Sequence, residues 1–181
     1  MFLALCGALV TTPGAAGFSG ISNYQDDRWH VLDEYRRYIE DNQDKFPLGI
    51  RPFMLADWYH NTRHHQCPHD SWVNSIDVKE ISSGSRQEIR MINIIIALLG
   101  VFHDGSFEIE YINVQEYEIR RTKPLISSQI GHGDWIIDEF NFESVGIRHE
   151  MVHRGFWWLI FSGGRPEVRI LRRRYSSSRR P

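Results

Sequence analysis

The feature that most constrains this chain is a change of hydrophobic period near residue 69. Before it, apolar side chains recur every three or four residues, as on one face of a helix. After it, they alternate with polar residues or form short apolar runs between turn residues, which is typical of strands. Most connections are short, and short connections favour antiparallel neighbours because a parallel crossover needs a dozen residues or more. We therefore predict an α+β fold.

The N-terminal part is predicted to be helical and short. Residues 27–42 form the first expected helix, in which Leu32, Tyr35 and Ile39 share a face. Residues 51–60 form a second short helix in this interpretation, with Pro52 in its first turn, where proline is tolerated.

About seven or eight strands follow, and they predict a mainly antiparallel β-meander or a partly closed barrel. Residues 89–102 and 156–161 are apolar on both faces, which is typical of central strands that are covered on both sides. We expect five of their side chains to be buried in adjacent parts of one sheet: Ile94, Ile96, Leu98, Trp158 and Ile160.

The length of 181 residues fits one domain, which we place at residues 24–172, followed by a basic disordered tail at 173–181. Residues 1–23 form an apolar leader that is signal-like or disordered. Its apolar run resembles a signal peptide, but no Lys or Arg precedes Arg28. We expect a cytoplasmic protein, or a secreted or periplasmic one if the leader is a signal peptide. No apolar run reaches the roughly 20 residues of a membrane-spanning helix.

Charge and motif content exclude several function classes. A net charge of −2 argues against a nucleic-acid-binding protein. The two cysteines, Cys6 and Cys67, do not form a disulfide framework in this interpretation, because Cys6 lies in the leader. There is no glycine-rich phosphate loop and no nucleophile elbow, and we expect no cofactor.

One group of residues carries possible metal ligands: His60, His64, Cys67 and His69, with His65 among them. If they converged on one point, the protein could be a metal-dependent hydrolase. Their spacing matches no established zinc motif, and imidazolium side chains also suit a helix C-terminus. We therefore expect no metal and keep the hydrolase as the alternative.

Histidine precedes aspartate three times, in the pairs His69–Asp70, His103–Asp104 and His132–Asp134. Each pair stands at the start or turn of a strand, where neighbouring side chains point to opposite faces and do not pair as an acid–base dyad. We expect the aspartates to brace the turns, with positive φ supplied by Gly105 or Gly133. A functional role gains weight if the three histidines meet at one end of a sheet.

Two further patterns concern polar residues on strands. His149 and His153 share a strand face but lie about 13 Å apart, too far for one metal, so we expect them to be exposed. Four acidic residues, Glu108, Glu110, Glu116 and Glu118, could form one side of a hairpin that attracts a basic partner protein; an ordinary solvated face is the alternative.

Three segments, 69–73, 98–105 and 131–139, together resemble a group of small uncharacterised bacterial proteins with HDSW, LLGxxHDG and GHGDW segments. Some of these proteins look like immunity proteins of bacterial toxin systems. The resemblance covers residues 35–168 and implies a small β-rich fold with a toxin-like protein partner. It carries over no catalytic residues.

We therefore expect a non-catalytic binding protein rather than an enzyme, one that neutralises a partner toxin by surface complementarity. The candidate binding residues are polar and lie on or beside the strands: Glu108, Glu110, Glu116, Glu118, Asp70, His103, Asp104, His132 and Asp134.

Overall fold

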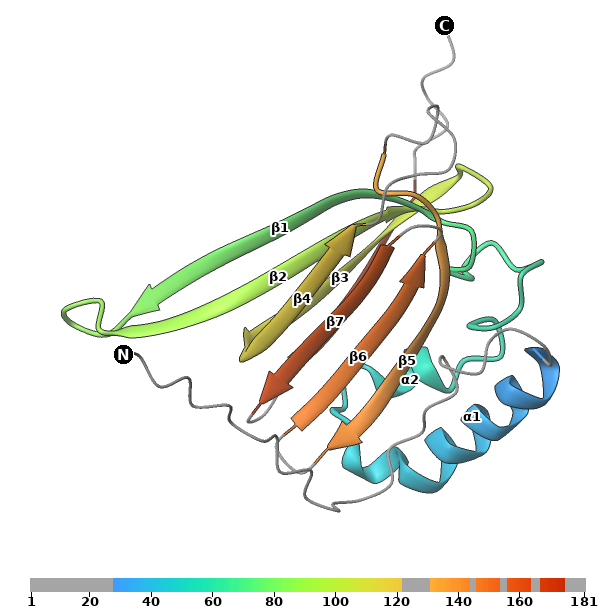
Figure 1. The fold of residues 1–181 in the computed structure, drawn as a ribbon, viewed down its shortest axis with the longest axis horizontal. Helices are drawn as coiled ribbons and strands as arrows, with labels where there is room; N and C mark the ends of the chain where they lie inside the picture. Colours follow the sequence, from blue (N-terminus) through green and yellow to red (C-terminus); the bar gives the residue numbers. More distant parts are fainter. Residues whose placement is uncertain (1–27, 122–130, 144–145, 154–155, 164–166, 175–181) are drawn as a thin grey trace, which may run out of the picture.

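The computed structural model describes residues 28–121, 131–143, 146–153, 156–163 and 167–174. Helix α1 (Arg28–Asn42), the short 3-10 helix η2 (Gln43–Lys45) and helix α2 (Arg51–Met54) come first. Eight strands follow in the described residues: β1 (Trp72–Ser83), β2 (Ile89–Leu99), β3 (Gly105–Val114), β4 (Glu116–Arg121), β5 (Trp135–Glu143), β6 (Gly146–His153), β7 (Phe156–Gly163) and β8 (Glu167–Arg174). The predicted α+β class with antiparallel pairing is confirmed (Figure 1).

The strands form two four-stranded sheets, with orders β1-β2-β3-β8 and β4-β7-β6-β5. All six pairings are antiparallel. The expectation of a single meander or partly closed barrel is therefore wrong. β3 pairs with β2 on one side and with β8 on the other, so β4 finds no free edge there and joins the second sheet instead.

The inner faces of the two sheets share one hydrophobic core. Ile94, Ile96 and Leu98 of β2 are completely buried, as predicted. Their cross-strand neighbours on β3 are also in the core, together with residues of β5, β6 and both helices. The predicted partners Trp158 and Ile160 lie on β7, in the other sheet, so the expectation that all five share one sheet is wrong; their side chains are outside the described part.

β2 is central in its sheet, as its sequence predicts, but only one of its faces is closed. Ile94, Ile96 and Leu98 point into the core, whereas Ile95 and Leu99 on the opposite face are half-buried. β1 is an edge strand whose second half is exposed on both faces. The β1–β2 hairpin extends past the other strands in Figure 1.

Helix α1 protects the free edge of β5, as Figure 1 shows. Tyr35 and Ile39 are buried one turn apart on its inner face, as their spacing predicts. The Tyr35 hydroxyl accepts the backbone N–H of Phe140 at 2.6 Å, and the Tyr38 hydroxyl accepts that of Phe142 at 2.9 Å. An edge strand presents unpaired backbone groups, and these two tyrosines satisfy two of them.

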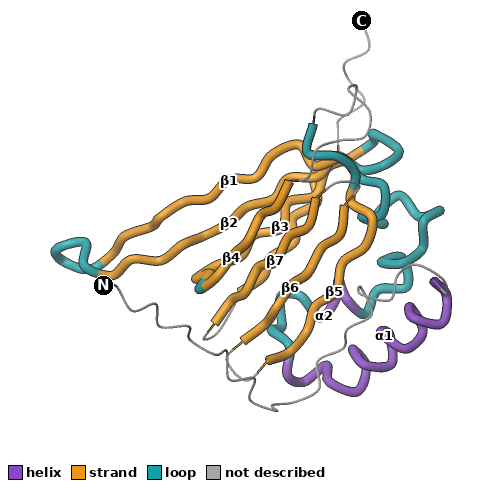
Figure 2. Tube along the Cα trace, in the orientation of Figure 1, coloured by secondary structure: helices purple, strands orange, loops and turns teal. Residues whose placement is uncertain are grey.

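The second predicted helix is shorter than expected. α2 ends at Met54, and the chain continues through consecutive turns that bring Tyr59 and Cys67 into the core. Figure 2 shows this long irregular segment between α2 and β1. It supplies half of the site described next.

The ends of the domain differ slightly from the prediction. β8 runs to Arg174, two residues beyond the predicted boundary at 172, and pairs there with the start of β3. The predicted leader at 1–23 and the tail beyond 174 lie outside the described residues. Among the described helices, none combines the length and the apolar character needed to cross a membrane.

Candidate functional site

The three histidine–aspartate segments meet at one end of the fold. The Trp135 N–H donates to the Ser71 carbonyl at 2.8 Å, and the Val73 N–H donates to the Gly133 carbonyl at 3.1 Å, which joins the first segment to the third. Trp72 and Asp134 form an isolated β-bridge. The Trp72 ring contacts the His103 ring of the β2–β3 turn at 4.6 Å between centroids. The three segments therefore lie side by side at this end, and among their histidines the Trp72 contact places His103 there.

Two large aromatic side chains are half-exposed on this end. Trp72 is 50% exposed and Phe102 is 46% exposed. His65 stacks on Phe102 with centroids 4.0 Å apart, and its Nδ1 lies 2.7 Å from an Asp104 carboxylate oxygen. We call Trp72, Phe102, His103, His65 and Asp104 the aromatic–histidine patch.

Two polar residues of these segments adopt left-handed backbone angles. Asp70 has φ 61° and His103 has φ 55°, and Gly133, with φ 85°, takes positive φ as predicted. Gly105 does not; it is the first residue of β3, and His103 adopts the left-handed conformation of the turn instead. Non-glycine residues in this region carry strain of roughly 1–3 kcal/mol. Such a conformation persists only where the surrounding structure fixes it, and here the turn places the His103 ring against Trp72.

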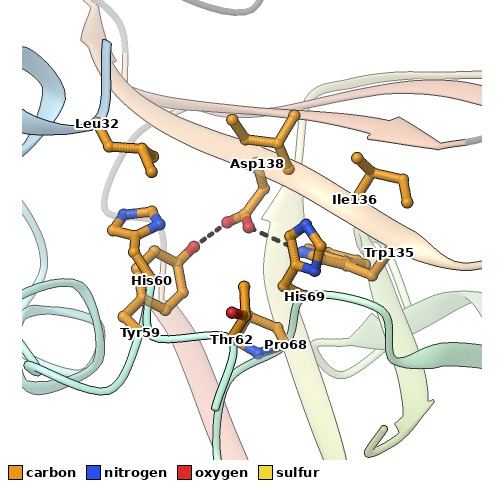
Figure 3. A pocket seen from close by; sticks show the side chains of 10 residues that line it. Leu32, Tyr59, His60, Thr62, Pro68, His69, Trp135, Ile136 and Asp138 are labelled. Carbon is orange, nitrogen blue, oxygen red and sulfur yellow. Dashed lines mark hydrogen bonds between the residues drawn. The ribbon is translucent and has the colours of Figure 1, made fainter. Parts of the chain in front are cut away.

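A pocket of about 210 Å³ opens beside this end, between the irregular segment and the start of β5 (Figure 3). Its walls combine apolar, aromatic and polar side chains: Leu32, Tyr59, His60, Thr62, Pro68, His69, Trp135, Ile136, Ile137 and Asp138. Figure 3 shows Asp138 between Tyr59 and Trp135, with both histidines nearby.

Asp138 is the centre of a buried hydrogen-bond network. One carboxylate oxygen accepts the Tyr59 hydroxyl and His149 Nε2, the latter at 2.9 Å. The other oxygen accepts Trp135 Nε1–H at 2.8 Å. Residues three apart on a regular strand point to opposite faces. Here a β-bulge between Trp135 and Ile137 shifts the phase, which allows Trp135 to reach Asp138.

His149 completes the network from β6. The Tyr111 hydroxyl of β3 lies 2.6 Å from His149 Nδ1, which links the two sheets through the core. The His149 ring also stacks on Phe140 at 3.5 Å. The exposed fraction of His149 is 1%, so the expectation of an exposed histidine is wrong there; the side chain of His153 lies outside the described part.

The pKa values follow from burial and from these hydrogen bonds. Burial alone would raise the pKa of Asp138, but the donors His149, Tyr59 and Trp135 lower it below its usual value. Burial lowers the pKa of His149 despite the neighbouring carboxylate. The pKa of Tyr59 and that of Tyr111 are raised well above the usual value, first by burial and then by the charge of Asp138. At neutral pH the network therefore consists of one carboxylate and neutral donors.

The four alternative metal ligands have separate partners instead of a common centre. The Cys67 thiol donates to the Tyr59 carbonyl, and burial raises its pKa to about 11, so it is no thiolate at neutral pH. His60 packs edge-on against Tyr59, His64 stacks on Trp58, and His69 lies beside Asp70. No group of three or more His, Cys, Asp or Glu side chains in the described residues is arranged to hold a metal ion.

The predicted acidic residues are not brought together on one hairpin. Glu108 and Glu110 lie on β3 in the first sheet, and Glu116 and Glu118 lie on β4 in the second. β3 and β4 are consecutive but unpaired. By contrast, the segments that contain Asp70, His103 and Asp134 lie side by side, and His103 belongs to the aromatic–histidine patch. His132 precedes Asp134 there and is exposed.

Sequence reasoning missed the buried network entirely. From the sequence, Asp138 and Tyr59 stand out only as part of a strand and of a short helix, and His149 only as one of two histidines on a strand face. One signal was available: Asp138, Glu139 and Asn141 are consecutive or nearly consecutive polar residues in a strand whose neighbours are aromatic. A polar side chain within such a strand requires a buried partner.

Comparisons with models of protein families, with curated proteins and with solved structures found no match to this chain.

Proposed function

We propose that this protein is a non-catalytic binding protein that docks a partner protein on the aromatic–histidine patch, in the manner of an immunity protein. The observation that supports the proposal is the exposure of Trp72 and Phe102 at the end where the three histidine–aspartate segments meet. Half-exposed aromatic side chains forgo part of their burial free energy, and tryptophan is enriched among residues that dominate binding energy.

The patch is also preorganised. Phe102 is held by the His65 ring, which is itself held by Asp104, and Trp72 is held by His103. A side chain that is already fixed loses little conformational entropy when a partner covers it.

The charge near the patch favours a partner with a basic surface. Asp70 and Asp104 have carboxylates that are about half-exposed, and Asp134 is half-buried nearby. Asp70 lies beside His69 and Asp104 beside His65, and an arginine or lysine of a partner would find complementary charge in these carboxylates. A basic toxin is the partner class that agrees with both this charge and the family resemblance.

The test uses the full chain and the protein encoded by the neighbouring gene. We expect calorimetry to detect binding and co-expression to relieve the partner's toxicity. The double variant Trp72→Ala, Phe102→Ala should bind about 100-fold more weakly. The control Leu48→Ala removes an apolar side chain that is 77% exposed in a loop outside the patch and should bind normally. Unchanged affinity of the double variant, or no binding by the unmodified chain, would overturn the proposal.

A further inference from the structure

The pocket beside Asp138 contains a buried carboxylate. Its ten lining residues include the Asp138 carboxylate but neither lysine nor arginine. The three donors to that carboxylate are neutral at physiological pH: the Trp135 indole does not ionise, and burial raises the pKa of Tyr59 and lowers that of His149. A buried charge that is compensated only by neutral dipoles attracts an opposite charge strongly, since the surroundings screen it less than water does.

The lining also offers hydrogen-bond acceptors that the described residues leave open. A carboxylate accepts at about four lone-pair sites, and Asp138 uses three of them, with only Trp135 on its second oxygen. His60 makes ring contacts with Tyr35 and Tyr59, yet within the described residues neither of its ring nitrogens has a hydrogen-bond partner. Burial lowers the pKa of His60, so its imidazole is neutral and presents one acceptor nitrogen.

The remaining walls are suited to a cation with a short carbon stem. Tyr59 and Trp135 are among the lining residues, although each is only 1% exposed, and aromatic rings attract ammonium and guanidinium groups. Leu32, Ile136 and Ile137 supply apolar contact for methylene groups. Because none of the ten described lining residues is a lysine or an arginine, an anionic ligand would lack such a partner there and would be repelled by Asp138.

We propose that this pocket binds a small organic cation, an alkylammonium or alkylguanidinium group on a short apolar stem, with Asp138, His60 and the Thr62 hydroxyl as acceptors. The group could belong to a free amine or to a lysine or arginine side chain. This site is separate in its chemistry from the docking patch, and it does not depend on the proposed partner.

The test compares ligands of equal size and different charge on the full chain. n-Butylamine, n-butanol and butyrate are titrated at pH 7, and the indole N–H signal of Trp135 is followed by NMR, assigned with Trp135→Phe. We expect saturable shifts of the indole signal with n-butylamine. The affinity for n-butylamine should exceed that for n-butanol about tenfold or more, because only the amine can form a charge-assisted hydrogen bond with the carboxylate. A second arm with acetyl-lysine-methylamide separates the sources, since its binding assigns the site to a side chain and its failure assigns it to a free amine.

Two variants keep the outcome decisive. Asp138→Asn should abolish the preference for the amine over the alcohol. The Thr62 hydroxyl lies outside the core network, so Thr62→Val should weaken amine binding while the fold is retained. The Trp72→Ala, Phe102→Ala variant should bind n-butylamine normally, which separates this inference from the docking proposal. Equal binding of amine and alcohol, tighter binding of butyrate, or amine shifts that Asp138→Asn leaves unchanged would overturn the inference.

Discussion

Removing single hydroxyl groups tests the buried network with minimal change of volume. Tyr59→Phe deletes the hydroxyl that donates to Asp138, and Tyr111→Phe deletes the hydroxyl next to His149 Nδ1. Both rings are 1% exposed and remain in place in the variants, so no large cavity forms. Each variant therefore reports on one hydrogen bond of the network.

The magnitudes follow from the charge of each acceptor. A hydrogen bond to a charged group contributes roughly 1.5–3 kcal/mol, and one between neutral groups contributes roughly 0.5–1.5 kcal/mol. We therefore expect Tyr59→Phe to lower the free energy of unfolding by about 2 kcal/mol, and Tyr111→Phe to lower it by about 1 kcal/mol. For a domain of this size, about 2 kcal/mol corresponds to a decrease of roughly 4–8 °C in Tm.

The assay is urea denaturation followed by tryptophan fluorescence, with the m-value checked for each variant. Tyr117→Phe is the matched control, because Tyr117 on β4 is 41% exposed and should change stability by less than about 0.5 kcal/mol. In an Asp138→Asn background the effect of Tyr59→Phe should shrink, since the charged acceptor is gone. If Tyr59→Phe is as harmless as Tyr117→Phe, the inference that an ionised Asp138 organises the core is wrong.

Three further predictions concern stability. The pKa of His149 is lowered in the folded state, so the unfolded chain takes up a proton first as the pH falls. The free energy of unfolding should therefore fall as the pH drops below the ordinary histidine value of 6.5, with a further loss as the pH falls through the lowered pKa of Asp138. Urea midpoints that do not move between pH 7 and 5 would contradict this. Tyr38→Phe should cost about 1 kcal/mol in the same assay, because it leaves the Phe142 N–H on the β5 edge without its tyrosine acceptor; an unchanged urea midpoint would argue against the edge contact. Ile96→Ala should cost roughly 2–5 kcal/mol, because Ile96 is fully buried, whereas Ile81→Ala on the exposed part of β1 should cost far less, and similar losses would refute the position of the core.

The sequence predicted local structure better than it predicted the arrangement of the strands. The period of α1, the central position of β2 and the β6–β7 hairpin are all visible in the order of apolar residues, because each depends on near neighbours in the chain. The division into two sheets is not visible, because it depends on β8 returning to the free edge of β3. That pairing joins residues about 60 positions apart, and no local pattern encodes it.

The site shows the same distinction. The three histidine–aspartate segments could be singled out because each forms a recognisable turn, although their meeting depends on backbone bonds such as Asp70 N–H to the Trp135 carbonyl at 2.7 Å. The Asp138–His149 contact could not be predicted from the sequence. The alternation of apolar and polar residues along a strand assigns each side chain to one of the two sheet faces, but it does not show which face is covered. The bulge after Trp135 adds a further shift that a regular period cannot anticipate.

The position of Asp138 connects the stability of the core with the chemistry of the pocket. Its carboxylate organises Tyr59, Trp135 and His149 in the core, and the same carboxylate lines the cavity. A cation that binds only the folded state should therefore stabilise the whole domain, by about 2.7 kcal/mol at a ligand concentration one hundred times Kd. A ligand bound at the aromatic–histidine patch would stabilise the fold by the same law of mass action, but without altering the Trp135 indole signal. The two sites can thus be distinguished in one protein: both kinds of ligand raise Tm, and only the pocket ligand changes the environment of Asp138.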